Sequence, residues 1–213
     1  MSVLHLGAIV EGHGEVRAAP ILVHRIASEW DPTQTVIVKP VVRSPSSWLK
    51  KPGALESEVE NVVRRLGGMG GVLVLLDCDW HAGCPKFDGP PWLKRAREAR
   101  RDVPISVVFA YREFEAWFIA AAESIRGYCG LPLDLVPDPR PEAIRNAKGW
   151  LTRHMPRNRP YAETTDQPAL TRAFDMHAAR RTDSFDKCYR EIVKLLTTLK
   201  RKDSGHSAAR GAR

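Results

Sequence analysis

Four stretches of apolar and β-branched residues divide the first half of the chain. They cover residues 3–10, 35–43, 72–77 and 105–110, and turn-forming residues bound each of them. Stretches of this length and composition predict β-strands. None of them alternates regularly between apolar and polar positions, which indicates strands that are covered on both faces.

The segments between these stretches follow the helical period. Residues 15–30 carry apolar side chains three and four positions apart, and Pro20 marks either a first turn or a kink. Residues 55–66 repeat in the same way before Gly67 and Gly68, and residues 92–101 form a short, basic helix candidate. Alternating strands and helices predict an α/β fold with a mainly parallel sheet flanked by helices.

The second half of the chain has a different pattern. Residues 113–126 are spaced as an amphipathic helix, and proline-rich connectors then separate helical segments around residues 141–154, 168–176 and 184–200. We therefore expect an α/β domain over residues 1–127, a helical appendage packed on it over residues 128–199, and a disordered basic tail over residues 200–213.

Composition limits the class of protein. A chain of 213 residues with 43% hydrophobic and 27% charged residues can bury a core in one domain with an appendage. No apolar run approaches the roughly 18 residues of a membrane span, and the first ten residues lack the features of a signal peptide. The four cysteines are too few for a disulfide scaffold. These features predict a cytoplasmic protein with free thiols and no contact with a membrane.

The formal net charge is +8 at pH 7, and five of the basic residues lie in the last fourteen positions. A basic balance suits contact with nucleic acid, although basic tails also occur on proteins that bind none. The candidates for holding phosphate are Arg43, Lys50 and Lys51 in one loop, and Lys94 and Arg97 in the basic helix candidate. The alternative is that these side chains are ordinary solvated surface.

Acidic residues follow three of the predicted strands. Glu11 ends the first strand, with Glu15 close behind it, while Asp77 and Asp79 end the third and Glu113 follows the fourth. In a parallel sheet the carboxyl ends of the strands meet at one edge, where ligands bind. Carboxylate oxygens are suited to Mg²⁺ or Mn²⁺. The sequence predicts a metal site there, with capping of turns as the alternative for each residue.

Two further features bear on this site. Glu113 and Glu115 flank Phe114, so both face the metal if the segment is extended, whereas only one can do so if it is helical. The helix dipole also favours acidic residues in a first turn, so a purely structural role stays open. We prefer Glu113 as an outer ligand, and Lys148 as the cation that holds the phosphate.

Two segments, AIVEGHGE at residues 8–15 and LLDCD at residues 75–79, resemble the Toprim domain. This α/β module occurs in topoisomerases, bacterial primases, recombination-repair proteins and the overcoming-lysogenization-defect nucleases. Three more segments, at residues 112–118, 165–170 and 184–187, resemble a bacterial family of small stand-alone Toprim-like proteins of unknown function. The first resemblance covers about half of the chain, and the second covers nearly all of it.

The resemblance implies roles for particular residues. Glu11 would be a metal ligand or general acid/base, Asp77 and Asp79 would be Mg²⁺ ligands, and Glu15 would be the second glutamate of a branch that cuts DNA with two metals. The implied function is a Mg²⁺-dependent nuclease, with nucleic acid as substrate and an ATPase partner in phage defence. The alternative is a non-catalytic regulatory subunit that binds a metal–nucleotide or docks on an ATPase. A homodimer is compatible with either function.

Overall fold

The computed structural model describes residues 3–80 and 82–211. At its centre is a parallel sheet of β1 (Val3–Val10), β2 (Thr35–Arg43), β3 (Gly71–Asp77) and β4 (Ile105–Ala110), in the spatial order β2-β1-β3-β4. The α/β class is therefore confirmed. Each predicted strand is present, and only β3 differs, because it begins one residue earlier.

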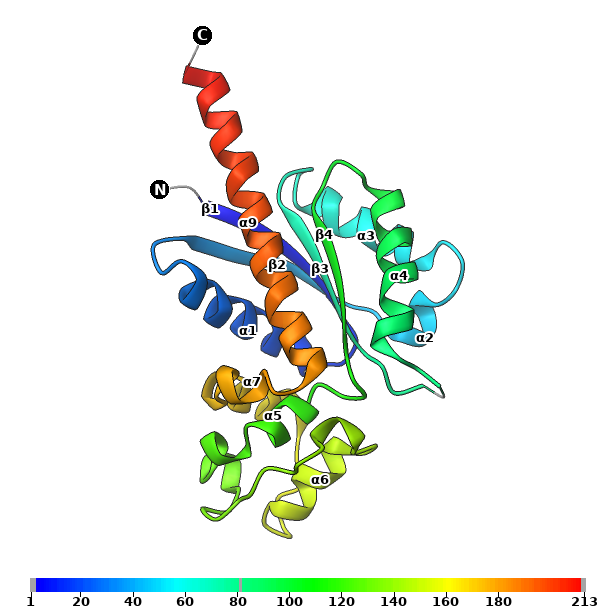
Figure 1. The fold of residues 1–213 in the computed structure, drawn as a ribbon. Helices are drawn as coiled ribbons and strands as arrows, with labels where there is room; N and C mark the ends of the chain where they lie inside the picture. Colours follow the sequence, from blue (N-terminus) through cyan, green and yellow to red (C-terminus); the bar gives the residue numbers. More distant parts are fainter. Residues whose placement is uncertain (1–2, 81, 212–213) are drawn as a thin grey trace.

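Helices cover both faces of the sheet. Figure 1 shows α1 (Glu15–Trp30) and α9 (Asp183–Gly211) on one face, and α2 (Ser46–Leu49), α3 (Ala54–Arg65) and α4 (Pro85–Ala99) on the other. Successive side chains of a strand point to opposite faces. Accordingly, Leu73 and Leu75 of β3 join the core under α1 and α9, while Val72 and Val74 join the core under α3 and α4. Two cores explain why the strands are apolar without alternation.

Helix α4 begins seven residues before the predicted start at residue 92. The prolines at 85, 90 and 91 concealed this first part from the pattern of the sequence. Pro85 occupies the first turn, where its missing N–H group costs no hydrogen bond. The helix ends at Ala99, two residues before the predicted end.

The appendage lies beyond the carboxyl edge of the sheet (Figure 1). In the structure, we use the name appendage for the part of the chain between β4 and α9, which begins earlier than the expected residue 128. Its helices are α5 (Ala116–Ala120), α6 (Ala147–His154), α7 (Glu163–Ala173) and α8 (Met176–Ala179), with 3-10 turns η1 (Ala122–Ile125), η2 (Tyr128–Gly130) and η3 (Pro141–Ala143). The single helix predicted over residues 113–126 was wrong. All five residues of α5 are buried, so this segment has no polar face, and the chain leaves the helical conformation at Ala121.

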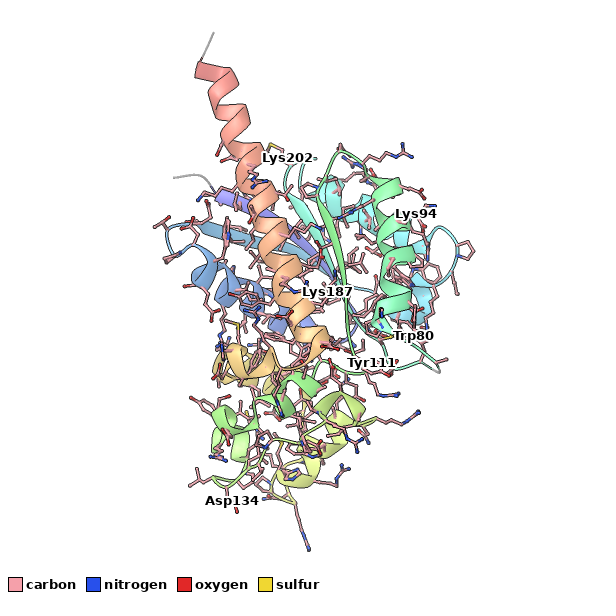
Figure 2. The ribbon with its side chains drawn as sticks, in the orientation of Figure 1. Trp80, Lys94, Tyr111, Asp134, Lys187 and Lys202 are labelled. Atoms are coloured by element: carbon pink, nitrogen blue, oxygen red, sulfur yellow. The ribbon has the colours of Figure 1, made fainter. Side chains whose placement is uncertain are left out.

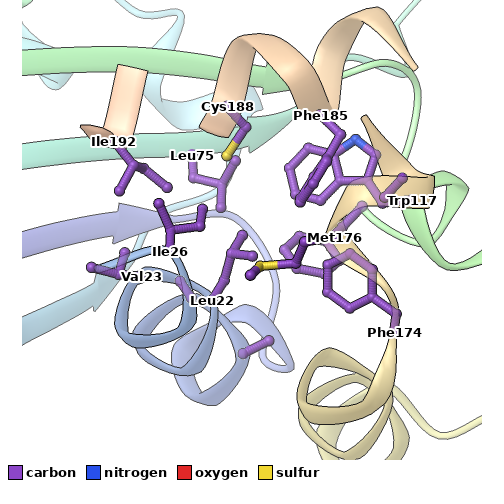
Figure 3. Packing of buried hydrophobic residues seen from close by; sticks show 14 of the residues in the cluster. Leu22, Val23, Ile26, Leu75, Trp117, Phe174, Met176, Phe185, Cys188 and Ile192 are labelled. Atoms are coloured by element: carbon purple, nitrogen blue, oxygen red, sulfur yellow. The ribbon is translucent and has the colours of Figure 1, made fainter. Parts of the chain in front are cut away.

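One buried cluster runs from α1 into the appendage. Figure 3 shows Leu22 and Ile26 of α1 on one side of it, with Trp117, Phe174 and Phe185 on the other. The Phe174 and Phe185 rings meet edge to face with their centroids 5.4 Å apart. Aromatic packing of this kind stabilises the junction beyond the area that it buries. The appendage is thus fixed against the carboxyl edge of the sheet.

Helix α9 continues through Gly211, past residue 200, where we expected the basic tail to begin. Leu195, Leu196 and Leu199 are buried on the sheet, and the Nζ atom of Lys200 lies 2.6 Å from the carboxylate of Asp31. These contacts anchor the helix on both sides of the predicted boundary. Residues 212 and 213 lie outside the described part of the chain.

Two other sequence expectations can be compared with the structure. All four cysteines are free. Across residues 3–80 and 82–211, every helix is too short or too polar to cross a membrane.

Candidate functional site

The carboxyl ends of the strands are tied together by acidic side chains. Glu11, directly after β1, accepts hydrogen bonds from the backbone N–H of Asp77 (3.1 Å) and from the hydroxyl of Ser46 (2.7 Å). Asp77, the last residue of β3, accepts a hydrogen bond at Oδ1 from the backbone N–H of Phe114 (2.9 Å). Each carboxylate therefore holds the backbone of a neighbouring strand end. This pattern arises because parallel strands end side by side.

Lys148 connects the appendage to this edge. It lies in the first turn of α6, and its backbone N–H donates to Oε2 of Glu113 at 2.9 Å. Its Nζ atom lies 3.7 Å from Asp77, 3.8 Å from Glu115 and 3.8 Å from Glu163. Burial works against the ammonium charge, but the carboxylates of Glu115 and Asp77 outweigh it and raise the pKa of Lys148. A cation is thus held at the centre of the acidic cluster.

Glu115 is the most enclosed acid of the cluster, with no exposed surface. Its Oε1 atom accepts hydrogen bonds from the hydroxyl of Tyr161 (2.8 Å) and from the amide of Gln167 (3.2 Å), whereas its Oε2 atom accepts none. Burial raises the pKa of Glu115 to about 7, although Lys148 lowers it in part and Glu15 raises it further. This carboxyl group can therefore gain or lose a proton near neutral pH.

The neighbouring acids respond to the same environment. Burial, followed by the charges of Glu15 and Glu115, raises the pKa of Asp77 well above its ordinary range. Burial also raises the pKa of Glu15, which Lys148 opposes. Several buried carboxylates that repel one another favour the arrival of a proton or of a cation.

Gly14 lets the appendage approach this edge. Glu15 begins α1, and its carboxylate accepts a hydrogen bond from the backbone N–H of Gly12. A Cβ atom on Gly14 would lie 2.6 Å from the carbonyl oxygen of Glu163 at the start of α7. No other residue leaves space for that approach, because real Cβ contacts are longer. The turn between β1 and α1 is therefore shaped by contact with α7.

Of the acids predicted for the site, Glu11, Glu15 and Asp77 come together at one edge. Glu113 reaches the backbone of Lys148, whereas the turn at residues 114–115 sends Glu115 into the buried cluster. Asp79 is exposed and makes no hydrogen bond or ion pair within the described residues. The extended geometry that would have paired it with Asp77 ends at the last residue of β3.

The predicted phosphate-binding cations fall into two groups. Arg43 ends β2 at the carboxyl edge, Lys50 lies over the ring of Trp80 at 3.7 Å, and Lys51 lies over Trp48 at 4.6 Å. In contrast, the two cations on α4 point away from the carboxylates. Arg97 donates to the carbonyl of Ile105 at the amino end of β4, and Lys94 pairs with Glu98 at 4.0 Å. Only the first group lies beside the carboxylates.

Three residues of the cluster were absent from the candidates taken from the sequence. Tyr161, Glu163 and Gln167 all come from the appendage, and they reach Glu115, Lys148 and Glu15 only after the chain has folded. Tyr161 is 46 residues from Glu115 in the sequence, and no local spacing connects the two. The Glu-Phe-Glu spacing after β4 was the only local indication of this part of the site.

The donor atoms of the cluster are of the kind that a divalent cation prefers, but the side chains are not arranged around a common metal position. Its donors are carboxylate oxygens, and two buried atoms, Oε2 of Glu115 and Oε1 of Gln167, lack hydrogen-bond partners. Within the described residues, however, no three acidic, histidine or cysteine side chains are arranged to hold a metal ion. The cation between the carboxylates is instead the Lys148 ammonium.

Comparison with protein-family models, curated proteins and solved structures gives no match for this chain. Its function is therefore argued from the site.

Proposed function

We propose that this protein is a Toprim-like phosphodiesterase that depends on Mg²⁺ or Mn²⁺ and cuts nucleic acid. The observation that carries the proposal is the buried group of Asp77 and Glu115 around the Lys148 ammonium at the carboxyl edge of the sheet. Within the described residues, Oε2 of the fully buried Glu115 makes no hydrogen bond and has only the Lys148 ammonium beside it, at 3.8 Å. Buried polar atoms are normally hydrogen-bonded, so a donor or a metal cation that arrives there would complete its environment.

The proposal assigns different tasks to the acids. Asp77 and Glu15 would hold the cation, because each has an oxygen inside the cluster and a raised pKa. Glu11 would act as a positioning residue, since its two oxygens already hold Ser46 and the backbone of Asp77. A bound Mg²⁺ or Mn²⁺ supplies Lewis-acid stabilisation of the charge that develops on a phosphate.

The chain's own groups would handle protons and phosphate. With a pKa of about 7, Glu115 is suited to take a proton from the attacking water or to return one to the leaving oxygen. The Lys148 side chain is 37% exposed, so its ammonium can reach a phosphate that arrives from solvent. Arg43, Lys50 and Lys51 are exposed near the same edge and suit the next phosphates of a strand.

A regulatory subunit without catalysis is the second candidate. One observation favours it, because the Lys148 ammonium already lies among the carboxylates of Asp77, Glu115 and Glu163 and balances part of their charge. In that case the edge would serve as a docking or metal–nucleotide site. The ATPase partner and the role in phage defence are parts of the proposal that rest on the resemblance alone. A homodimer is compatible with either candidate function.

The experiment that tests the proposal is Asp77→Asn. Asparagine can still accept the hydrogen bond from Phe114 at Oδ1, but it removes the charged oxygen that faces Lys148. We expect Mn²⁺ affinity, measured by calorimetry, to fall about tenfold or more. Cleavage of single-stranded DNA, duplex DNA and RNA should fall with it. The variant should melt no lower than the wild type, because carboxylate repulsion is relieved.

Two matched variants complete this test. Asp134→Asn makes the same change at an exposed position of the appendage, which Figure 2 places at the far end from the sheet, and should behave as the wild type. Asp79→Asn tests whether the exposed second aspartate contributes to metal binding. Equal Mn²⁺ binding by the wild type and Asp77→Asn would refute the metal site. Metal binding without cleavage of any substrate would favour the regulatory subunit.

A further inference from the structure

A second concave region of the molecule lies outside the carboxylate cluster. It is a groove of about 850 Å³ along the open edge of β4, between α4 and α9. In Figure 2, Lys187 on α9 and Tyr111 just after β4 mark one side and one end of it. Apolar side chains such as Leu93 and Phe109 dominate its lining. This volume and character are typical of small-molecule sites.

The floor of the groove offers backbone hydrogen-bonding groups. Within the part of the chain that the structure describes, β4 pairs with β3 alone. The carbonyl of Ala110 faces β3, because it accepts a hydrogen bond from the N–H of Cys78 at 2.9 Å. In a parallel ladder, alternate residues direct their N–H and C=O groups to opposite sides. Val107 and Phe109 therefore direct theirs to the groove. Such an alternation of donors and acceptors matches the edge of a heteroaromatic base.

The carboxyl end of the groove is basic. Arg112 follows β4 and Lys86 lies in the first turn of α4, so both line the groove at this end. Among the described residues, the buried Nε atom of Arg112 has no hydrogen-bond partner, and the guanidinium carbon lies 5.2 Å from the centre of the Tyr111 ring. A buried guanidinium N–H that has no acceptor is suited to an anionic oxygen.

The remaining charges of the groove are acidic or already paired. Lys187 and Glu191 form an ion pair at 2.7 Å along α9. Glu142 accepts a hydrogen bond from the backbone of Ser184 at 3.0 Å, and Asp183 lines the groove beside it. Carboxylates at such a position can accept hydrogen bonds from the hydroxyl groups of a ribose.

We propose that this groove binds a nucleotide, with the base against the backbone of Val107 and Phe109 and the phosphate on Arg112 and Lys86. Edge-to-edge pairing with β4 of a second copy does not fit, because the β4 edge lies recessed between two helices and an equally recessed edge cannot reach it. The bound unit is either a free nucleotide or one nucleotide of a longer strand. The proposal is independent of the metal site.

The test uses the full chain labelled with ¹⁵N and titrated with AMP. The amides of Val107 and Phe109 should shift and saturate. Arg112→Gln and Lys86→Gln should each weaken AMP about tenfold while leaving adenosine unchanged, since they remove only contacts to phosphate. Lys94→Gln is the matched control, because Lys94 lies beside Leu93 on α4 and outside the groove. Leu93→Trp should abolish binding by filling the groove.

A four-nucleotide DNA strand separates the two sources of the nucleotide. Tighter binding than AMP at the same amides identifies a nucleotide within a strand, and equal or weaker binding identifies a free one. Asp77→Asn should still bind AMP, so a failure of the metal site stays distinguishable from a failure here. The proposal is overturned if no nucleotide shifts the two amides, if an extended pentapeptide alone shifts them, or if Arg112→Gln weakens adenosine as much as AMP.

Discussion

Replacing Glu115 by Gln should raise the stability of the protein above neutral pH. Glutamine keeps an oxygen that can accept the hydrogen bond from Tyr161, and it removes the charge on the Oε2 atom that faces Lys148. The wild-type carboxylate has no exposed surface, and its charge is opposed by burial. A neutral amide of the same shape avoids that penalty.

The magnitude follows from the pKa of Glu115, which is about 7 in the folded protein against an ordinary value of 4.5. Between these values the folded state binds more protons than the unfolded state, so the free energy of unfolding falls as pH rises. The contribution is complete below about pH 4.5 and lost above about pH 7. At about 1.4 kcal/mol per pH unit, ionisation of Glu115 lowers the free energy of unfolding of the wild type by about 3 kcal/mol above pH 7. The pKa already includes the attraction of Lys148.

Urea denaturation from pH 4 to pH 9 measures this effect. The wild type and Glu115→Gln should be equally stable near pH 4, and the variant should be more stable by up to about 3 kcal/mol at pH 8. A chain of this size should then melt about 6–12 °C higher. Glu123→Gln is the control, because the Glu123 side chain is 69% exposed and its ion pair with Arg126 lies at the surface. Parallel stability curves for the wild type and Glu115→Gln would refute the reasoning.

Two further substitutions test the Lys148 ammonium and the close contact between Gly14 and the carbonyl of Glu163. Lys148→Met should destabilise the protein by about 3 kcal/mol at pH 8 and by less at pH 5, where the carboxylates can take up protons. Urea denaturation measures this difference, and an equal loss of unfolding free energy at pH 5 and pH 8 would contradict the prediction. Gly14→Ala should cost about 1–3 kcal/mol, because its Cβ would meet the carbonyl of Glu163 at 2.6 Å. Gly89→Ala, with nothing within 4 Å of its Cβ, should cost less than 1 kcal/mol by the same measurement.

The strands were predictable because their cause is local. A run such as residues 72–77 is apolar on both faces, and no other element of that length suits it. Helix α4 was harder to predict, because prolines interrupt its first half. The prediction of a single helix after β4 was wrong for a different reason. Trp117 and Phe118 pack against Phe185 and Phe174, which are more than 50 residues away in the sequence. Tertiary packing, and not periodicity, decides where such a helix ends.

The residues of the candidate site also fall into those that local sequence could place and those that depend on distant contacts. Glu11 and Asp77 could be placed because the carboxyl ends of parallel strands share an edge. Glu115 could not be ranked above Glu113 without the turn between them. Tyr161 and Gln167, which set the environment of Glu115, reach it from the appendage. Rules of topology locate the edge of a sheet, whereas burial and charge there depend on contacts between distant segments.

The two oxygens of each central carboxylate have separate tasks. In Asp77, Oδ1 holds the backbone of Phe114 while Oδ2 faces Lys148, and in Glu115, Oε1 holds Tyr161 while Oε2 faces the same ammonium. An alanine substitution would remove both tasks at once, so lost activity could not be separated from a disturbed edge of the sheet. An amide keeps the oxygen that accepts the structural hydrogen bond, and it removes the charge that faces Lys148. Amide variants at these two positions therefore distinguish a functional site from a structural tie.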